Sequence, residues 1–359
     1  MHRIGLILLS VLLLSGCGAQ KKILEDVQLT RTIGFDEAEG NKVRGTVALM
    51  ITPPGQNVQP RTDILTNVSY TGKGIRQLLQ AESPKPILVG KVRTVLYGEK
   101  VAHSNLYRYV DTLQRDPNIG RDVYLAITEG ETMPFLQLRS PMSQGPGMYI
   151  EQLLEQNSKT NFPKTDLHHF LYHYLGKGLD PIMPLLSLRG NHIFIKGIAL
   201  FKKGKYIGKY IPYKQGFIFK ALYEPFERGM YEIQMKPHGF ITIQNIGSSV
   251  KYKILNGSTN PAVHIFLSMK GRVVESPDLA VRDFKAINKF EAQIEKQIQK
   301  EALKMMRMFQ KEHIDPLGIG DRARSQTRNF NIKKWEKQYA SIPIYVKVNV
   351  QITQAGIAE

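Results

Sequence analysis

The chain has 359 residues, of which 42% are apolar, and a single cysteine, Cys17. This length allows two or three domains with large cores, and one cysteine excludes internal disulfides and cysteine-ligated zinc. Lys and Arg outnumber Asp and Glu by 49 to 31, which gives a formal net charge of +18. A basic excess of this size fits either nucleic acid or an anionic surface.

The first sixteen residues have the three parts of a secretory signal peptide. His2 and Arg3 are basic, residues 4–14 are mostly apolar, and Ser15 and Gly16 are small. The apolar run is about half of the ~20 residues that a transmembrane helix needs. Leu14-Ser15-Gly16-Cys17 resembles the lipobox of bacterial lipoproteins, in which the cysteine thiol receives a diacylglycerol before cleavage leaves it as residue one. The alternative is an ordinary leader with an incidental cysteine.

We therefore expect residues 1–16 to be a lipoprotein signal peptide and Cys17 to be an S-diacylglycerol cysteine that is also N-acylated. Each buried CH2 contributes about 0.8 kcal/mol, so several acyl chains on one residue make a lasting anchor. Residues 17–27 form a short linker that holds the folded body close to the membrane. For an exported, lipidated chain the partner of the positive charge is the anionic membrane surface, and we expect no nucleic acid.

Strands and helices alternate in the first part of the body. A strand at 42–52 is followed by a loop with three prolines at 53–60; then come a helix at 72–80, a strand at 87–98, a helix at 104–115 and a strand at 122–130. This alternation predicts helices packed against a mixed or parallel sheet.

Residues 140–147 interrupt this alternation and predict a subdomain junction. Helices are predicted at 148–157 and 165–178, the second with Thr165 as N-cap and Gly176 as its stop. Residues 179–191 contain two prolines and predict a connector.

The remainder of the chain is rich in strands. A hairpin is predicted within 192–211, and β-rich runs at 231–235, 240–245, 249–255 and 262–268 predict a meander. Apolar residues spaced by three, four or seven predict a long amphipathic helix at 282–312, packed against a sheet or, as the alternative, against a partner. They are Phe284, Ile287, Phe290, Ile294, Ile298, Met305 and Phe309. Strict alternation at 342–353 predicts a strand with one buried face and one exposed face.

No pattern typical of a catalytic site is present. The sequence has no G-x-S-x-G, H-E-x-x-H, Walker A or G-x-G-x-x-G motif, so we expect no catalytic residue, no cofactor and no enzyme activity. Asp166, His169 and His173 would lie on one side of a helix and could hold a metal. Without further ligands nearby, a structural role is favoured and no metal site is expected.

Three further sets of residues are candidates for binding. Gly318-Ile319-Gly320-Asp321 is similar to part of a phosphate loop, but it ends the long helix without opening another, which predicts a helix stop. Asp315 could cap this turn or meet a basic side chain. Arg115 and Arg121 could form structural ion pairs or a partner surface; the structural role is favoured in each case.

Taken in order, several segments resemble the Ger(x)C family, the C-subunit lipoproteins of spore germinant receptors. In the N-terminal half they are SYTGKGIRQLL, GKVRTVLYGEKVA and LQRDPNIGRDVYLAITEG. In the C-terminal half they are IKGIALFKKGKYIGKYI, HIDPLGIGDRAR, WEKQY and YVKVNVQITQAG. Each segment is a weak motif, whereas their colinear order over the whole body is specific.

The resemblance implies an α+β fold of three domains, each a mixed or antiparallel sheet with flanking helices. We place an N-terminal α/β domain at 28–140 and a middle region at 141–191, with 52–71 completing a discontinuous second domain. A C-terminal α+β domain at 192–359 contains the long helix and the last strand.

The resemblance also implies a non-enzymatic role. The protein would join a polytopic A subunit and a polytopic B subunit in a nutrient receptor, lipid-anchored through Cys17 at the outer face of the spore inner membrane. The family brings no defined ligand-binding site, so ligand-binding residues stay unknown. The alternative is a substrate-binding lipoprotein of a transporter. Such a protein should have two similar lobes, and the sequence shows no such pair.

Overall fold

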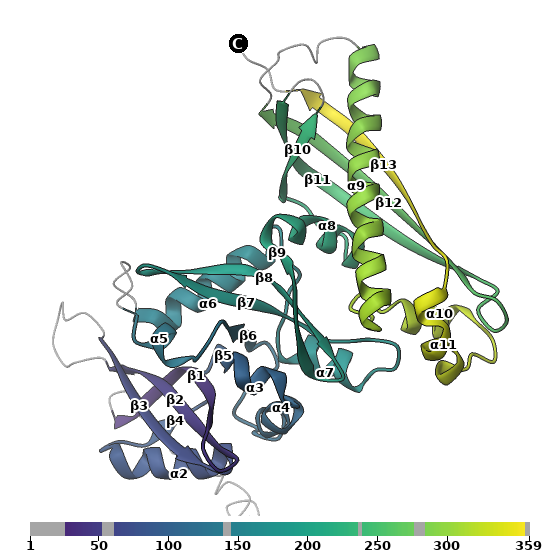
Figure 1. Cartoon of the computed structure of the whole chain (residues 1–359). Helices are drawn as coiled ribbons and strands as arrows, with labels where there is room; N and C mark the ends of the chain where they lie inside the picture. The colour runs from purple at the N-terminus through teal and green to yellow at the C-terminus, as the bar shows by residue number, and fades with distance from the viewer. Residues whose placement is uncertain (1–25, 52–60, 139–144, 236–238, 276–283, 356–359) are drawn as a thin grey trace, which may run out of the picture.

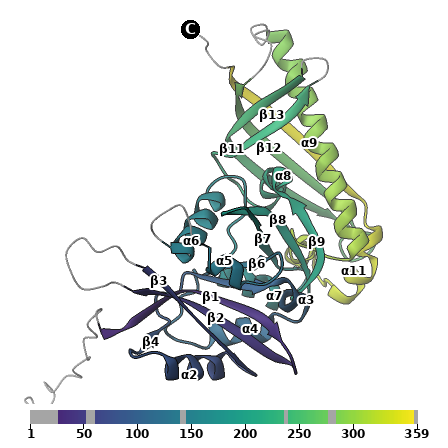
Figure 2. The ribbon, with the colours of Figure 1, turned by 60° about the vertical axis from the view of Figure 1, so that its left-hand side comes forward.

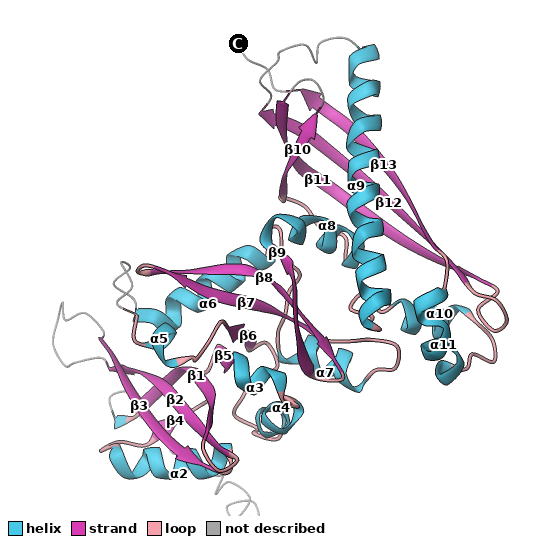
Figure 3. Cartoon of the chain, viewed as in Figure 1, coloured by secondary structure: helices cyan, strands magenta, loops and turns pink. Residues whose placement is uncertain are grey.

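The computed structural model describes residues 26–51, 61–138, 145–235, 239–275 and 284–355. These residues form two β-sheets with flanking helices, and the second sheet stands beyond one end of the first (Figure 1). Helices and strands are mixed along the chain, as Figure 3 shows by colour. The predicted α+β class is confirmed.

The first sheet has nine strands in the order β3-β2-β1-β5-β6-β7-β8-β9, with β4 paired to β1. The strands are β1 (Gln28–Ala38), β2 (Lys42–Ile51), β3 (Arg61–Ser69), β4 (Ile87–Leu88), β5 (Thr94–Gly98), β6 (Tyr124–Thr128), β7 (Ile182–Arg189), β8 (His192–Lys202) and β9 (Lys205–Pro212). The central strands β1, β5, β6 and β7 are parallel, and antiparallel strands extend the sheet on both sides. The predicted mixed sheet is therefore present.

Helices cover both faces of this sheet. They are α2 (Gly72–Glu82), α3 (Glu99–His103), α4 (Tyr107–Gln114), α5 (Met133–Leu136), α6 (Gly145–Ser158), α7 (Leu167–Leu175) and α8 (Tyr213–Tyr223). The apolar residues of α2, α3, α4 and α7 join one buried cluster, and those of α5, α6 and α8 join another. Every residue of β5 and β6 is buried, which is typical of parallel strands covered on both faces.

The prediction of a connector at 179–191 is wrong, because residues 182–189 form strand β7. The first six residues of β7 are buried, Pro184 included. The strand is therefore a continuous apolar run and lacks the alternation by which a half-exposed strand is predicted. The expected domain boundary at 191/192 falls in the turn between β7 and β8, which pair from Ile182 with Leu200 to Arg189 with His192. The division into three domains stays a prediction.

The second sheet has the order β10-β11-β12-β13. Its strands are β10 (Met230–Met235), β11 (Gly239–Leu255), β12 (Ala262–Glu275) and β13 (Ile344–Ala355). The first three form an antiparallel meander, and β13 is parallel to β12. The runs predicted at 240–245 and 249–255 are one strand, because a register shift between Asn245 and Gly247 interrupts the pattern without ending the strand.

The long helix α9 (Phe284–Glu312) packs on one face of the second sheet, as predicted. Phe290, Ile294, Ile298, Met305 and Phe309 are buried in the same cluster as the inner residues of β12 and β13. Two short helices, α10 (Ile319–Gln326) and α11 (Ile332–Gln338), connect α9 to β13. The amphipathic pattern of α9 therefore reflects packing against the second sheet, which is the first of the two alternatives.

α9 also covers the free edge of β13. The Glu295 carboxylate accepts a hydrogen bond from the Val350 N–H at 2.9 Å, and Glu291 accepts one from the Ile352 N–H at 2.7 Å. The Gln299 amide donates to the Val346 carbonyl at 2.7 Å. Because side chains occupy these backbone groups, this stretch of the edge is closed to an added strand.

Glu295→Ala should lower the free energy of unfolding by about 1–2 kcal/mol, because the Val350 N–H loses its acceptor in a partly buried position. Glu295→Gln keeps an amide oxygen there and should stay within about 0.5 kcal/mol of the parent. Urea denaturation of both variants measures the difference. Equal losses would show that the hydrogen bond does not stabilise the edge.

Candidate functional site

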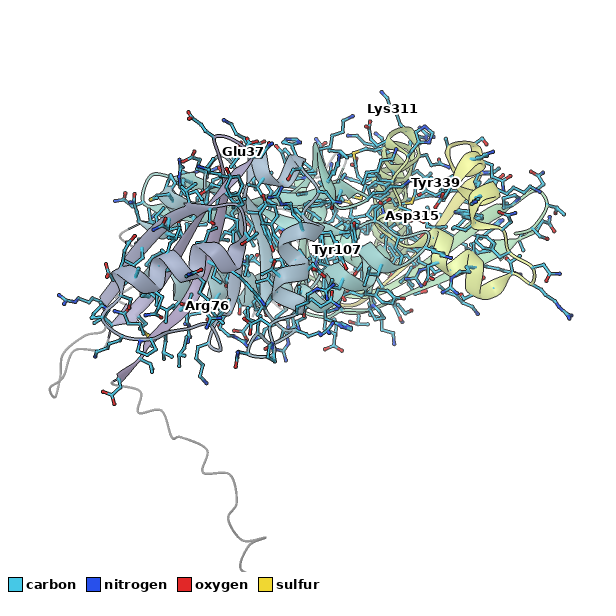
Figure 4. The ribbon with its side chains drawn as sticks, turned by 90° about the horizontal axis from the view of Figure 1, so that it is seen from below. Glu37, Arg76, Tyr107, Lys311, Asp315 and Tyr339 are labelled. Atoms are coloured by element: carbon cyan, nitrogen blue, oxygen red, sulfur yellow. The ribbon has the colours of Figure 1, made fainter. Side chains whose placement is uncertain are left out.

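A cleft of about 560 Å³ lies where the N-terminal sheet meets the helices that follow α9. Its walls come from the end of α7, the β8–β9 turn, the loop after α9, and the end of α11. Lys177, Lys202 and Lys203 line one part of it, and Trp335 and Tyr339 line another. Figure 4 shows Asp315 and Tyr339 close together at this junction, and both border the cleft.

The loop after α9 places Asp315 at the base of the cleft. The helix ends at Glu312, as the predicted stop requires, but the expectation that no helix follows is wrong because α10 begins at Ile319. The Asp315 carboxylate accepts hydrogen bonds from the Ile319 N–H at 2.9 Å and the Gly320 N–H at 2.6 Å. The Asp315 carboxylate thus occupies the N–H groups at the start of α10 that a phosphate would need, so this segment is not a phosphate loop.

Asp180 connects this loop to the first sheet. Its carboxylate accepts from the Asp315 N–H at 2.8 Å and from the Lys203 N–H at 3.1 Å, and its own N–H donates to the Asp315 carbonyl at 3.0 Å. Burial raises the pKa of both carboxyl groups above their usual range, and that of Asp315 to about 7. The partly buried Asp180 carboxylate therefore joins the two parts of the molecule through backbone N–H groups, while the buried Asp315 carboxylate fixes the loop that Asp180 meets.

Two glycines let the backbones approach at the same junction. The Asp321 N–H donates to the Gly178 carbonyl at 3.2 Å, and a Cβ atom on Gly178 would lie 2.7 Å from the carbonyl carbon of Gly320. Gly178 also has a φ of +73°, which side-chain-bearing residues rarely adopt. This contact requires glycine at position 178 for both reasons.

The Asp166, His169 and His173 group of α7 does not converge on one point. Asp166, rather than the predicted Thr165, caps α7: its carboxylate accepts from the His169 N–H at 2.9 Å and contacts His169 Nδ1 at 2.6 Å. Although burial opposes it, hydrogen bonds from His169 lower the Asp166 pKa to about 2. These contacts give both residues a structural role.

His173 is bound on both ring nitrogens. Nδ1 lies 3.1 Å from the Asp180 carbonyl oxygen, and Nε2 lies 3.0 Å from the Tyr223 hydroxyl. Burial lowers the His173 pKa, which favours the neutral ring. Among the described residues, no group of three or more His, Cys, Asp or Glu is placed to hold a metal ion.

Arg115 and Arg121, the candidate partner contacts, are not among the residues that line the cleft. Arg115 Nε forms an ion pair with Asp111 at 2.8 Å one turn earlier in α4, which supports its structural role. The Asp116 carboxylate accepts from the Asn118 N–H at 3.0 Å and shapes the turn between the arginines. The Arg121 side chain is exposed, while its carbonyl accepts from the His168 N–H at 3.0 Å.

Sequence reasoning missed Asp180 and Gly178. A signal was present: Leu179-Asp180-Pro181 and Ile314-Asp315-Pro316 repeat the pattern apolar-Asp-Pro, and the structure joins these two segments. The Tyr339 hydroxyl was also missed. It is buried at the cleft and, among the described residues, has no hydrogen-bond partner.

Asp315→Asn should reduce the pH dependence of stability. Because the folded pKa is about 7 and the ordinary value is 3.8, the Asp315 contribution is complete below about pH 4 and is lost as the pH rises through 7. His173 acts in the opposite direction because its folded pKa is lowered. In Asp315→Asn the fall in stability that the ionisation of Asp315 causes should disappear, and the pH dependence due to His173 should remain.

Thermal unfolding between pH 5 and 8 measures this effect. We expect Asp315→Asn to be less stable by about 1–2 kcal/mol at pH 5, since one backbone N–H loses its acceptor. Its melting temperature should then fall less than that of the parent as the pH rises. Asp63→Asn, at an exposed position of β3, should keep the parental pH profile. A parental profile for Asp315→Asn would contradict the assignment.

One prediction from the sequence concerns the attachment of the protein to the membrane. Cys17 lies outside the described residues, so its lipid attachment stays a prediction. Within the described part of the chain, none of the helices combines the length and the apolar character that crossing a bilayer requires.

Two family descriptions match the chain in order. Residues 20–188 match the spore germination protein N-terminal domain, and residues 196–356 match the spore germination B3/GerAC-like C-terminal domain. Together they cover almost all of the expected mature chain.

Full-length relatives agree with these matches. The spore germination protein GerQC of Bacillus cereus is 32% identical over 358 residues, which cover 98% of each chain. The spore germination protein KC of Bacillus subtilis (strain 168) is 22% identical and covers 98% of this chain and 95% of its own length. The crystal structure of the GerBC protein superposes with a TM-score of 0.60 at 17% identity, covering 90% of this chain and 97% of that one. At this identity the structural likeness shows the fold alone.

Proposed function

Because this chain belongs to the Ger(x)C family of spore germination proteins, the C-subunit family of germinant receptors, we propose that it is the membrane-anchored lipoprotein subunit of a nutrient germinant receptor. The full-length match to a spore germination protein carries the proposal, since 98% of each chain takes part. In this role the protein assembles with two polytopic subunits and helps to trigger germination.

The proposed attachment is through the acylated Cys17, at the outer face of the spore inner membrane. The lipobox supports it, and so does the net charge of +18, which favours an anionic headgroup layer. The linker at 17–27 is short, so the first sheet would lie next to the membrane.

The proposed role is non-enzymatic. The carboxylates of Asp315, Asp180 and Asp166 mainly hold backbone groups: Asp315 caps α10, Asp180 joins two loops at the junction, and Asp166 caps α7. An arrangement of this kind fits a subunit that transmits or organises contacts between partners. It supplies no nucleophile with a supporting base.

Affinity purification from detergent-solubilised spore membranes tests the proposal. A C-terminally tagged protein should bring down two multi-span subunits, and an untagged strain serves as the control. Recovery of the protein alone, or together with a transporter ATPase, would contradict the receptor role and favour the transporter alternative.

A further inference from the structure

Within the part of the chain that the structure describes, the face of the second sheet opposite α9 carries many exposed side chains. Seven of the thirteen exposed large apolar side chains of the described residues lie on β10–β13. They are Met230, Phe240, Ile246, Leu255, Phe266, Val274 and Tyr345. Phe240 and Tyr345 are each 55% exposed, which is unusual for aromatic residues of a sheet. A concentration of apolar surface on one element marks an interaction site.

Aromatic and basic side chains share rows across this face. His264 of β12 is paired in register with Lys253 of β11 and Tyr345 of β13. The imidazole stacks on the Tyr345 ring with centroids 4.9 Å apart and lies 6.4 Å from the Phe266 ring. In the next row, Phe266 lies between two lysines, Lys251 and Lys347. We call the side chains of these two rows the open face.

The charged residues of the two rows that form the open face are all basic. Lys251, Lys253 and Lys347 are exposed, and Lys270 and Arg272 follow on the same side of β12. Neither β11 nor β13 contains an acidic residue, and the acidic residues of the other two strands, Glu232 of β10 and Glu275 of β12, stand in the row of Thr242, away from the open face. The occupant of this surface must therefore bring negative charge.

Other occupants fit less well. A second copy meeting the same face would place lysines against lysines, which is repulsive. Strand addition would use an edge, and side chains of α9 close the edge of β13. In Figures 1 and 2 the second sheet lies at the end of the molecule away from β1–β4, whereas the chain that follows Cys17 enters at β1. A membrane held by the anchor would lie nearer to the first sheet.

We propose that the open face docks an acidic surface, with an apolar centre, on a part of a polytopic receptor subunit that projects from the membrane. This inference rests on the proposed assembly and names the surface that makes it. Aromatic side chains at the centre and charged residues at the rim are the composition of protein interfaces. Tyr345 and Phe266 would supply the buried centre, and the lysines would select the acidic partner.

The test compares two charge-reversed triple variants of the full-length, tagged protein. Lys251→Glu, Lys253→Glu and Lys347→Glu reverse the open face. Lys296→Glu, Lys300→Glu and Lys304→Glu reverse three exposed lysines of α9, which covers the opposite face of the same sheet. We expect the first variant to recover the two multi-span subunits at least tenfold less than the parent, and the second to stay within twofold.

A double variant removes the apolar centre without a change of formal charge. Phe266→Ala with Tyr345→Ala should reduce recovery of the subunits by at least tenfold, while thermal unfolding of the purified protein shows that the exposed positions leave the fold intact. Sedimentation with vesicles of phosphatidylcholine and phosphatidylglycerol, at a ratio of about 3:1, measures membrane binding of all variants in parallel.

The outcomes separate the two proposals. If the parent recovers the subunits and both open-face variants recover them equally well, the docking surface is wrong while the receptor assembly stands. If the parent recovers no subunits, the assembly fails and this inference fails with it. If the open-face variants lose vesicle binding but keep the subunits, the face belongs to the membrane, which overturns the inference.

Discussion

Cys17→Ala is expected to move the protein from the membrane to the soluble fraction, at least tenfold, and to abolish the nutrient response of the spore. Only a thiol at position 17 can take the diacylglycerol, and the described residues contain no helix that could span a bilayer in its place. Without acyl chains the remaining attraction is that of the basic surface for anionic lipids, which salt weakens. Fractionation in high salt, followed by immunoblotting, measures the shift.

Ser15→Ala is the matched control, because it keeps a small residue before Cys17 and leaves the thiol in place. It should stay in the membrane fraction and support a normal nutrient response. Normal germination by a soluble Cys17→Ala protein would remove the anchor from the proposed function. Retention of that variant in the membrane would instead show that other contacts hold the protein there.

Gly178→Ala is expected to lower the free energy of unfolding by about 3 kcal/mol or more. A Cβ atom at a φ of +73° costs about 1–2 kcal/mol, and this one would also lie 2.7 Å from the backbone of Gly320. Relieving such a contact moves the junction by tenths of an ångström, and overpacking of this kind costs about 1–3 kcal/mol. Urea denaturation of the full-length protein measures the loss.

Gly190→Ala separates the cost of the positive φ from the cost of the close contact. Gly190 has a φ of +56° in the β7–β8 turn, but nothing lies within 4 Å of the Cβ position. It should therefore lose only the conformational part, about 1–2 kcal/mol. If both variants lose the same free energy, the close approach of Gly178 and Gly320 does not contribute to the junction.

Periodic apolar residues were the most reliable guide in the sequence. They placed α9 within two residues of its observed start, and the alternation at 342–353 matched the buried and exposed sides of β13. β1 was missed although it is central, because Thr30 and Thr32 are buried there among Arg and Asp and weaken the apolar pattern. α8 was missed because seven of its eleven residues are buried, which leaves no polar face to give a period.

The sequence by itself determined the class of fold, the family through its colinear segments, and the predicted anchor at Cys17. The fold class, the family and the anchor can each be inferred from residues that are adjacent in the sequence or from segments in a fixed order along it. The tertiary structure alone decided that Asp180 meets Asp315, 135 residues away, and that rows from three strands form the open face. Local patterns report that a residue is buried or exposed, but the partner across a sheet or junction depends on how distant segments pack, which no short stretch encodes.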